Sequence, residues 1–374
     1  MKKEVFWCSN CLNMSTRPRI SFDERGWCNA CTWMEEKKTM NWEPRKEELL
    51  RLLEKHKSTT GGYNCIVPVS GGRDGSYVAY QLKEKYGMNP LTVTVRPALE
   101  LDLGDSNLKS FINSGFDHVH ITPNSNVMRE LNKFGFIDKG FPYYGWLIAI
   151  HTGVLRVACN FGITLIFYGE DGEVEYGGST ETKDISTYDS LYQRRVYLED
   201  GYEKVLGKIE EDDSKLYFFT FPEGSKLKNI DLTHWSYFDP WDSYRNYVVA
   251  KEHCGLTEKE FTNPGTFTNF AQNDQAFYAL HTYMMYLKFG FGRATQDVGI
   301  EIRRGAMDRN QALNLVKLYD NSYPDEFLDT YLDYYQISKD TFDTILDKWV
   351  NKDLFFKENN HWMPKFTVGE SFLI

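Results

Sequence analysis

The sequence predicts an α/β protein whose parallel β-sheet is covered by helices on both faces, between a small cysteine-containing module and a mostly helical C-terminal region. Two observations predict the sheet. From Cys65 onward, short runs rich in Val, Ile and Thr alternate with longer stretches of helical periodicity. The first of these strands also leads directly into a glycine-rich turn, "SGGRDGS" (70–76), from which a helix starts. Ligands of such sheets bind beyond the carboxyl ends of the strands, so we expect the functional site there.

The elements follow in a regular order along the chain. A charged helix begins at Pro44, a residue suited to the first turn, and leucines form its apolar side. Strands are expected at 65–68, 91–95, 117–122 and 163–169, and helices at 77–87, 106–115, 127–133 and 147–160. Further helices are expected at 243–255, 274–290, 310–320 and 338–350. The alternation of strands with helices is what predicts a parallel sheet.

The sequence suggests four segments. We expect residues 1–42 to form a zinc-binding module, on the basis of the cysteine pairs described below, and residues 43–178 to form the α/β domain. Residues 179–240 lose the alternation and mix acidic runs with aromatic residues, so we interpret them as an insertion or lid. Residues 241–374 form the helical region, which we expect to contact the substrate or a partner.

Composition limits the possible function. The formal net charge of −10 disfavours a protein that mainly wraps nucleic acid, because no basic surplus neutralises phosphates. Aromatic residues make up 16%, which suits either a surface that stacks on sugar rings or an aromatic-rich core. The chain has no apolar run of membrane-spanning length, and its N-terminus lacks the apolar stretch of a signal peptide. We therefore expect a cytoplasmic protein.

Four cysteines form two Cys-x-x-Cys pairs near the N-terminus, Cys8 with Cys11 and Cys28 with Cys31. The separation of the pairs by residues 12–27 fits the spacing of a four-thiolate zinc site. Such a site would be structural, because four thiolates complete the tetrahedron and leave no position for a water nucleophile. Redox activity of either pair is the alternative interpretation.

The turn at 70–76 indicates a phosphate-binding site. Glycines and serines at the start of a helix offer backbone N–H groups and hydroxyls to an anion, and the helix dipole adds attraction. The turn lacks the spacing of a Walker A loop and of a dinucleotide-binding loop. This disfavours ordinary kinases, GTPases and dehydrogenases.

The turn resembles the S-G-G-x-D-S loop of the PP-loop ATP pyrophosphatases, although Gly75 stands between Asp74 and Ser76. These enzymes cleave ATP between the α- and β-phosphates, transfer AMP to a carbonyl oxygen and release pyrophosphate. The resemblance implies a PP-loop (HUP-like) sheet.

Three further blocks narrow the resemblance: "TRPRISFDERGWCNAC" (16–31), "GEDGEVEYGG" (169–178) and "FGRATQDVGIEIRRGAMDRNQAL" (291–313). In this order, and over most of the chain, they resemble the N-acetyl sugar amidotransferases of bacterial surface-polysaccharide (O-antigen, lipopolysaccharide) and nonulosonic-acid biosynthesis. The resemblance implies adenylation of the amide oxygen of an N-acetylated sugar or nucleotide sugar. Ammonia would then displace AMP and leave an acetamidino group. The implied cofactors are ATP, Mg²⁺ and Zn²⁺.

The resemblance and the turn chemistry together assign the candidate site residues. The pyrophosphate cradle would comprise Ser70, Gly71, Gly72, Arg73, Asp74 and Ser76, with Asp74 orienting the loop or binding Mg²⁺. Thr94, Val95 and Arg96, at the end of the second strand, are expected near the nucleoside. Gly169, Glu170 and Asp171 reach the same rim as candidates for metal or substrate. Arg293, Arg303 and Arg309 are candidates for the cations that face the phosphates, unless they lie on a solvated helix face.

The source of ammonia is expected to be a separate protein. Glutamine hydrolysis requires a nucleophilic cysteine at the N-terminus or on a sharp turn, and Cys65, Cys159 and Cys254 are not in such settings. In the resembled family the ammonia comes from a glutaminase with a cyclase-like companion. Two alternatives remain open: a PP-loop enzyme that thiolates tRNA, and a zinc-ribbon module on a nucleotide fold without catalysis.

Overall fold

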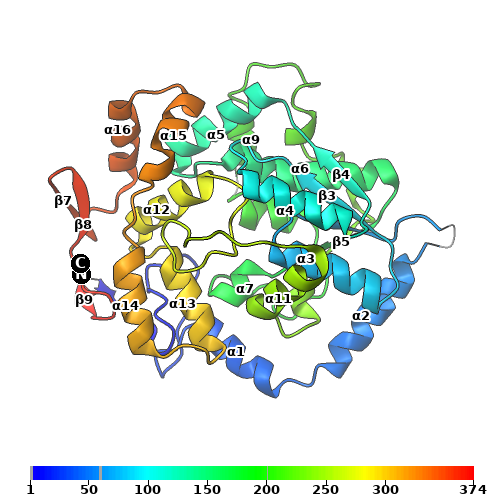
Figure 1. The fold of residues 1–374 in the computed structure, drawn as a ribbon, viewed down its shortest axis with the longest axis horizontal. Helices are drawn as coiled ribbons and strands as arrows, with labels where there is room; N and C mark the ends of the chain where they lie inside the picture. The colour runs from blue at the N-terminus through cyan, green and yellow to red at the C-terminus, as the bar shows by residue number, and fades with distance from the viewer. Residues whose placement is uncertain (1–2, 59–60, 200) are drawn as a thin grey trace.

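The computed structural model describes residues 3–58, 61–199 and 201–374. Its centre is a five-stranded parallel sheet in the order β4-β3-β2-β5-β6 (Figure 1). The strands are β2 (Cys65–Pro68), β3 (Pro90–Val95), β4 (His118–Ile121), β5 (Leu165–Tyr168) and β6 (Asp231–His234). The chain moves outward in one direction from β2 to β4 and in the other from β5 to β6. The switch point between β2 and β5 is where ligands of such sheets bind, and the predicted fold class is confirmed.

Side chains alternate between the two faces of the sheet because successive residues of a strand point in opposite directions. Cys65 and Val67 join the core under α2 (Glu43–His56), α3 (Arg73–Tyr80), α4 (Asp102–Asn113) and α11 (Ser243–Cys254). Ile66, between them, joins the core under α5 (Ser125–Lys139) and α6 (Tyr144–Phe161). Helices therefore cover both faces, as the sequence predicts, and α3 continues as a π-turn over Gln81–Lys85.

The segment 179–240 is not wholly an insertion, which corrects the predicted boundaries. It contains β6, whose four residues pair in parallel with β5, as with Ile166 and Leu232. Before β6 the chain forms short helical turns, among them α8 (Ser190–Tyr192), α9 (Tyr202–Leu206) and α10 (Gly224–Leu227). The sequence pattern missed β6 because "DLTH" has a single strongly apolar residue; its burial beside β5 gives it a place in the sheet.

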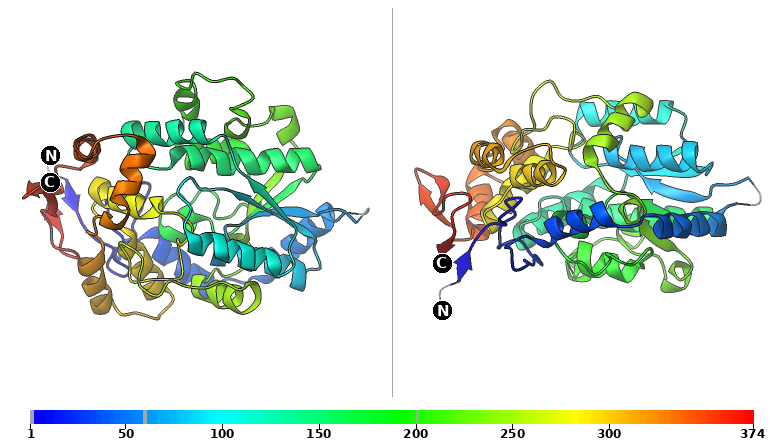
Figure 2. Two further views of the ribbon diagram at one scale, coloured as in Figure 1. Left: turned by 45° about the horizontal axis from the view of Figure 1, so that its top comes forward. Right: turned by 90° about the horizontal axis from the view of Figure 1, so that it is seen from below.

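The C-terminal region is helical up to a terminal hairpin, and it shares a core with the N-terminal module. Its helices are α12 (Phe277–Phe289), α13 (Arg293–Arg303), α14 (Arg309–Tyr319), α15 (Leu328–Tyr335) and α16 (Lys339–Trp349). Strands β7 (Phe355–Glu358) and β8 (His361–Pro364) form the hairpin, and β9 (Phe372–Leu373) pairs with β1 (Glu4–Val5). The two ends of the chain thus lie together (Figure 2), and Trp7 and Met14 are buried among the C-terminal helices.

Within the described residues, no helix combines the length and the apolar character needed to cross a membrane.

Candidate functional site

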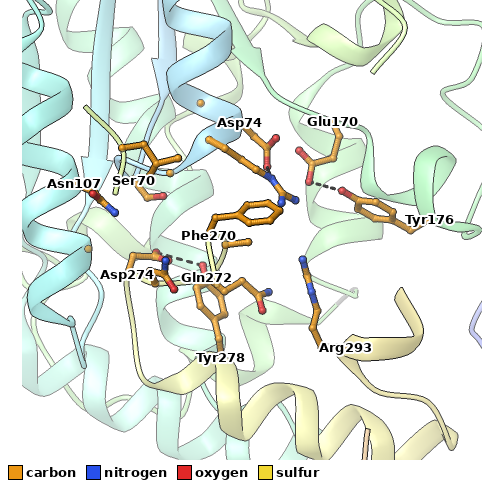
Figure 3. A pocket seen from close by; sticks show the side chains of 17 residues that line it. Ser70, Asp74, Asn107, Glu170, Tyr176, Phe270, Gln272, Asp274, Tyr278 and Arg293 are labelled. Carbon is orange, nitrogen blue, oxygen red and sulfur yellow. Dashed lines mark hydrogen bonds and ion pairs between the residues drawn. The ribbon is translucent and has the colours of Figure 1, made fainter. Parts of the chain in front are cut away.

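A cavity of about 240 Å³ lies at the carboxyl ends of β2 and β5, between the sheet and the C-terminal region (Figure 3). The turn after β2 contributes Ser70, Gly72, Arg73 and Asp74. Glu170 and Tyr176 come from the segment after β5, and Arg293 comes from the start of α13. Three blocks that are far apart in the sequence, at 70–76, 169–178 and 291–313, therefore meet in one cavity, which we call the phosphate cavity.

The turn at 70–76 is held tightly against α4. Gly71 has a φ of +76°, a left-handed backbone conformation that glycine adopts without strain. A Cβ atom at this position would lie 2.3 Å from the backbone nitrogen of Leu108 and 2.6 Å from the carbonyl carbon of Asn107. Only glycine fits, and the close approach sets where the N–H groups of the turn point.

We expect Gly71→Ala to destabilise the fold by about 2 kcal/mol or more, because it adds a backbone clash to the cost of a left-handed conformation. Thermal unfolding measures the change. Gly87→Ala is the matched control: Gly87 has a φ of +61°, but a Cβ there would meet nothing within 4 Å. The control should lose only about 1 kcal/mol, and equal losses in both variants would contradict the packing argument.

Asp74 stands in the first turn of α3 and points into the phosphate cavity (Figure 3). One carboxylate oxygen accepts a hydrogen bond from Arg73 Nε at 3.1 Å, and the other accepts one from Asn246 Nδ2 of α11 at 3.2 Å. Arg73 is buried and its guanidinium lies over the Phe270 ring. The pair keeps one negative and one positive group at fixed places in the cavity wall.

Glu170 lies beside Asp74 at the same edge of the cavity (Figure 3), and its Oε1 accepts a hydrogen bond from Tyr176 at 3.0 Å. Burial raises the pKa of the Glu170 carboxyl to about 7, and the nearby charge of Asp74 contributes to the increase. Two carboxylates that repel each other in a cavity form a natural site for a divalent cation, which would relieve the repulsion.

Arg293 is the predicted cation that the structure places in the phosphate cavity. Its Nε forms an ion pair with Asp297 at 2.9 Å, and Asp297 in turn accepts a hydrogen bond from Thr266 at 2.6 Å. This support fixes the guanidinium as it points toward Glu170 and Tyr176 (Figure 3).

Thr94 and Val95 line a second cavity of about 210 Å³, which adjoins the first at Ser70 and Gly75. Because its walls are mostly apolar, we call this second cavity the apolar cavity. Its lining includes the side chains of Val69, Val93, Pro97, Leu108, Trp146, Ile150 and Val154. A flat heterocycle fits such a lining. Arg96 is not part of it: its side chain pairs with Glu100 at 2.8 Å and lines a neighbouring hollow.

Ser76 and Asp171 are two of the predicted residues that do not line the phosphate cavity. Ser76 is fully buried behind the turn, on the inner side of α3. Asp171 caps α7 (Gly172–Tyr176) by accepting from the backbone of Glu173 and Val174, and Thr182 donates to its other oxygen. Local sequence could not separate this capping carboxylate from Glu170, its neighbour.

Arg303 and Arg309 turn toward the cysteine module instead of the phosphates. Burial opposes the charge of Arg303, but the Cys11, Cys31 and Cys28 thiols outweigh burial and raise the pKa of this guanidinium. Arg309 donates to the backbone carbonyl of Cys8 at 2.9 Å. On α13, Arg293 and Arg303 stand at opposite ends of the helix, so they serve two different sites. Gly169, the residue that follows β5, lies beside Asp74 and Trp241.

The four predicted cysteines form one buried cluster in which all Sγ atoms lie within 4.8 Å of one another. Sγ–Sγ distances are 3.4 Å for Cys11–Cys28, 3.7 Å for Cys28–Cys31 and 3.8 Å for Cys8–Cys31. A tetrahedral ion with metal–sulfur bonds of about 2.3 Å holds its thiolates about 3.8 Å apart. The cluster therefore fits a metal site, and the prediction that the four cysteines come together is confirmed.

The cysteine module is joined to the segment 170–178 by several side chains. Asn13 donates to the carbonyl of Tyr176 at 3.1 Å, and Asn29 donates to that of Gly178 at 2.6 Å. Lys37 and Trp33 of α1 (Asn29–Thr39) both bind the buried carboxylate of Glu175, at 2.6 and 2.9 Å. The module thus supports the segment that presents Glu170 and Tyr176 to the cavity.

The rest of the cavity comes from residues that sequence reasoning missed. The loop before α12 contributes Phe270, Ala271, Gln272, Asn273 and Asp274, and α12 itself contributes Tyr278. Asn107 of α4 completes that wall. The polar cluster "QND" directly before a helix was the available signal, but such clusters also serve as ordinary helix starts.

Comparison with known proteins concerns the wall of the phosphate cavity that is formed by the loop before α12, by α12 and by the start of α13. Residues 264–367 match the family model described as the C-terminal domain of WbpG-like LPS biosynthesis proteins. This region is similar to that domain, and we refer to it as the WbpG-like domain. It supplies Gln272, Asp274, Tyr278 and Arg293 to the phosphate cavity. The match supports the predicted family, the N-acetyl sugar amidotransferases.

Other similarities are partial or distant. An uncharacterized protein of Methanocaldococcus jannaschii, MJ1599, is 37% identical over 89 residues, which is 24% of this chain and 32% of that protein. The match thus spans about a third of the relative. Two solved structures align at low identity. The U34-tRNA thiolase NcsA of Methanococcus maripaludis, with its [4Fe-4S] cluster, has a TM-score of 0.31 and 14% identity over 71% of this chain and 79% of its own. A predicted subunit of a tRNA methyltransferase of Methanocaldococcus jannaschii has a TM-score of 0.23 and 15% identity. That alignment covers 50% of this chain and 87% of the other chain.

Proposed function

We propose that the protein is an ATP-dependent amidotransferase that converts the N-acetyl group of a sugar into an acetamidino group, with release of AMP and pyrophosphate. One observation carries the proposal: an anion-binding turn and a pair of repelling carboxylates meet in a cavity whose other wall is a WbpG-like domain. The acceptor is an N-acetylated sugar or nucleotide sugar of lipopolysaccharide or nonulosonic-acid biosynthesis.

The turn and the two arginines would hold the phosphates. Ser70 and Gly72, in the turn at the start of α3, line the cavity, where backbone N–H groups of the turn would bind the phosphates, and Arg73 and Arg293 carry positive charge at its wall. Pyrophosphate gains negative charge as it leaves, and fixed cations at that position stabilise the transition state. Both arginines are preorganised, by Asp74 and Asp297 respectively.

The residues present also fit a magnesium ion. Asp74 and Glu170 offer hard oxygen ligands in one part of the cavity wall, where a divalent cation would offset their mutual repulsion. Asp74 and Glu170 would hold the ion there, and its positive charge would offset the charge of the phosphates. Tyr176 orients Glu170 by its hydrogen bond, so the two carboxylates stay on one side of the cavity.

The apolar cavity would receive the adenine ring, since it adjoins the turn and is lined by Val93, Val95 and Trp146. The acetamido group would then enter from the WbpG-like wall. Direct attack of ammonia on an amide is slow, because the amide carbon is a poor electrophile. Transfer of AMP to the amide oxygen provides a good leaving group.

We further propose that the cysteine cluster holds zinc, because its sulfur spacing fits a single tetrahedral ion, whereas an iron–sulfur cluster would hold its thiolates farther apart. Ammonia would come from a separate glutaminase with a cyclase-like companion. We place the protein in the cytoplasm, where ATP and glutamine are available.

The products of ATP cleavage test the proposal. With Mg²⁺, ammonium and a panel of N-acetylglucosamine, N-acetylmannosamine, N-acetylneuraminic acid and UDP-N-acetylglucosamine, we expect AMP and pyrophosphate in equal amounts. Mass spectrometry should show a sugar lighter by about one mass unit, as expected when C=O becomes C=NH by simple mass balance. Stoichiometric ADP would overturn the mechanism, and sulfur transfer to tRNA would assign the thiolation alternative.

A further inference from the structure

We propose that Asp274 is the general base of the second half-reaction, accepting a proton from the ammonia that attacks the adenylated acceptor. The inference rests on the proposed function and adds a catalytic residue to it. Asp274 lines both the phosphate cavity and the apolar cavity. If phosphates occupy one and adenine the other, the α-phosphate and the acetamido carbon lie where the two cavities join, beside this carboxylate.

The backbone around Asp274 is fixed from two sides. Leu101 N–H donates to the carbonyl of Asp274 at 3.0 Å, and Ala276 N–H donates to that of Leu99 at 2.9 Å. Gly104 of α4 packs so closely that a Cβ on it would lie 2.4 Å from the Asp274 Cα. The carboxylate therefore projects from a rigid junction between the sheet domain and the WbpG-like domain, as a catalytic base requires.

Asp274 also differs in its partners from Asp74, the cavity carboxylate that pairs with Arg73. Glu170, like Asp274, accepts a hydrogen bond from a tyrosine. In the part of the chain that the structure describes, no lysine or arginine forms an ion pair with Asp274, and its side-chain hydrogen bond comes from Tyr278 at 3.4 Å (Figure 3). Its lone pairs remain available for an N–H group of a ligand.

The groups that face Asp274 set its basicity. Burial raises the pKa of its carboxyl to about 6; Tyr278 donates to it, and Glu100, from the segment paired with 274–276, adds repulsion. The charge of Asp274 in turn acts on Tyr143, next to the start of α6. Arg293 also lines the phosphate cavity. A carboxyl with this pKa is ionised at neutral pH yet is a stronger base than an exposed aspartate.

Ammonia forms a C–N bond to the carbon of the O-adenylated, protonated imidate, giving an adduct with an –NH3⁺ group. Asp274 accepts one proton from that group, so the adduct carries –NH2. The C–O bond to AMP then breaks, the nitrogen lone pair forms the C=N bond, and the product is an acetamidinium cation. The proton on Asp274 leaves with AMP or to water. Re-ionised Asp274 then faces the cationic product.

Asp274→Asn tests the assignment, because it keeps the shape and removes the base. With the panel sugar that supports AMP release, exchange of labelled pyrophosphate into ATP reports adenylation alone. We expect exchange within about threefold of wild type and amidine formation lower by roughly 10²–10³-fold. Hydroxylamine, which gives up its proton more readily than ammonia, should recover most of the rate. Asp343→Asn, in a surface ion pair with Lys339 on α16, is the control and should change neither rate.

The pH profile adds a readout that a structural role would not move. The pH profile of amidine formation by the wild type should have an acidic limb near pH 6 that is absent in Asp274→Asn, whereas the pH profile of pyrophosphate exchange should be the same in both proteins. Equal loss of exchange and amidine formation would reassign Asp274 to substrate binding and overturn the inference. Absence of wild-type exchange with every panel sugar would instead count against the proposed function.

A binding measurement needs no acceptor. In the presence of AMP and Mg²⁺, acetamidinium chloride stands in for the product cation. Calorimetry should show binding to wild type that is about tenfold weaker in Asp274→Asn, about 1.4 kcal/mol, with acetamide binding both alike. Equal affinity of acetamidinium for the two proteins would contradict the assignment.

Discussion

Asp74→Asn should reduce kcat for AMP release by roughly 10²–10³-fold, the effect of deleting one preorganised electrostatic contact. The substitution keeps the shape of the side chain but removes the charge that pairs with Arg73 and faces Glu170. It therefore weakens both the proposed magnesium site and the orientation of Arg73, which we propose faces the phosphates. Steady-state AMP release at saturating ATP measures the loss.

The stability of the same variant separates this role from a structural one. Asp74 contributes to the raised pKa of Glu170, so the substitution should move that pKa back toward its ordinary value of 4.5. A carboxyl with a raised native pKa binds its proton more tightly in the native state, and it weakens the fold as pH rises from about 4.5 through 7. Asp74→Asn reduces this penalty while it loses the pair with Arg73.

We therefore expect a net change of about 1 kcal/mol or less in the free energy of unfolding at pH 8. Asp343→Asn again serves as the control, with neither effect. Nearly normal turnover with a clearly lowered melting temperature would show that Asp74 is a structural residue of α3 and would contradict the catalytic assignment.

Cys8→Ser should remove the metal and lower the free energy of unfolding by about 4 kcal/mol or more, because a structural ion couples binding to folding. Wild type should carry about one zinc per chain by elemental analysis, and Cys31→Ser should behave like Cys8→Ser. The Trp33 indole, which donates to Glu175, lies at the contact between α1 and the segment 170–178 that this loss should loosen.

Loss of the ion should also impair the active site, since the module supports Tyr176 and through it Glu170. Cys159→Ser is the matched control: this thiol lies on α6, outside the cluster, and its loss should leave zinc content unchanged. Full metal retention in both Cys8→Ser and Cys31→Ser would contradict a four-cysteine site.

Local sequence was sufficient to predict a feature wherever one short stretch contains all the residues that form it. Two Cys-x-x-Cys pairs can close on one ion because the spacing is set along the chain, and the cluster forms as predicted. The turn at 70–76 shows its strand, its glycines and its helix in one run of sequence, and Ser70, Gly72 and Asp74 accordingly reach the cavity. Strand alternation also placed Glu170 at the same rim, because parallel strands end at one edge.

Tertiary structure decided what a pattern along the chain cannot encode. Arg293 and Arg303 are indistinguishable in sequence, yet they stand ten residues apart on α13, one at the phosphate cavity and one beside the cysteines. Asp171 caps a helix while Glu170, its neighbour, faces Asp74, since successive side chains point in different directions. Asp274 becomes a site residue only because Gly104 lets its loop pack against α4. Sequence by itself determined the fold class, the cluster of four cysteines and the glycine-rich turn after β2. Contacts between distant segments determined which charged groups share a cavity.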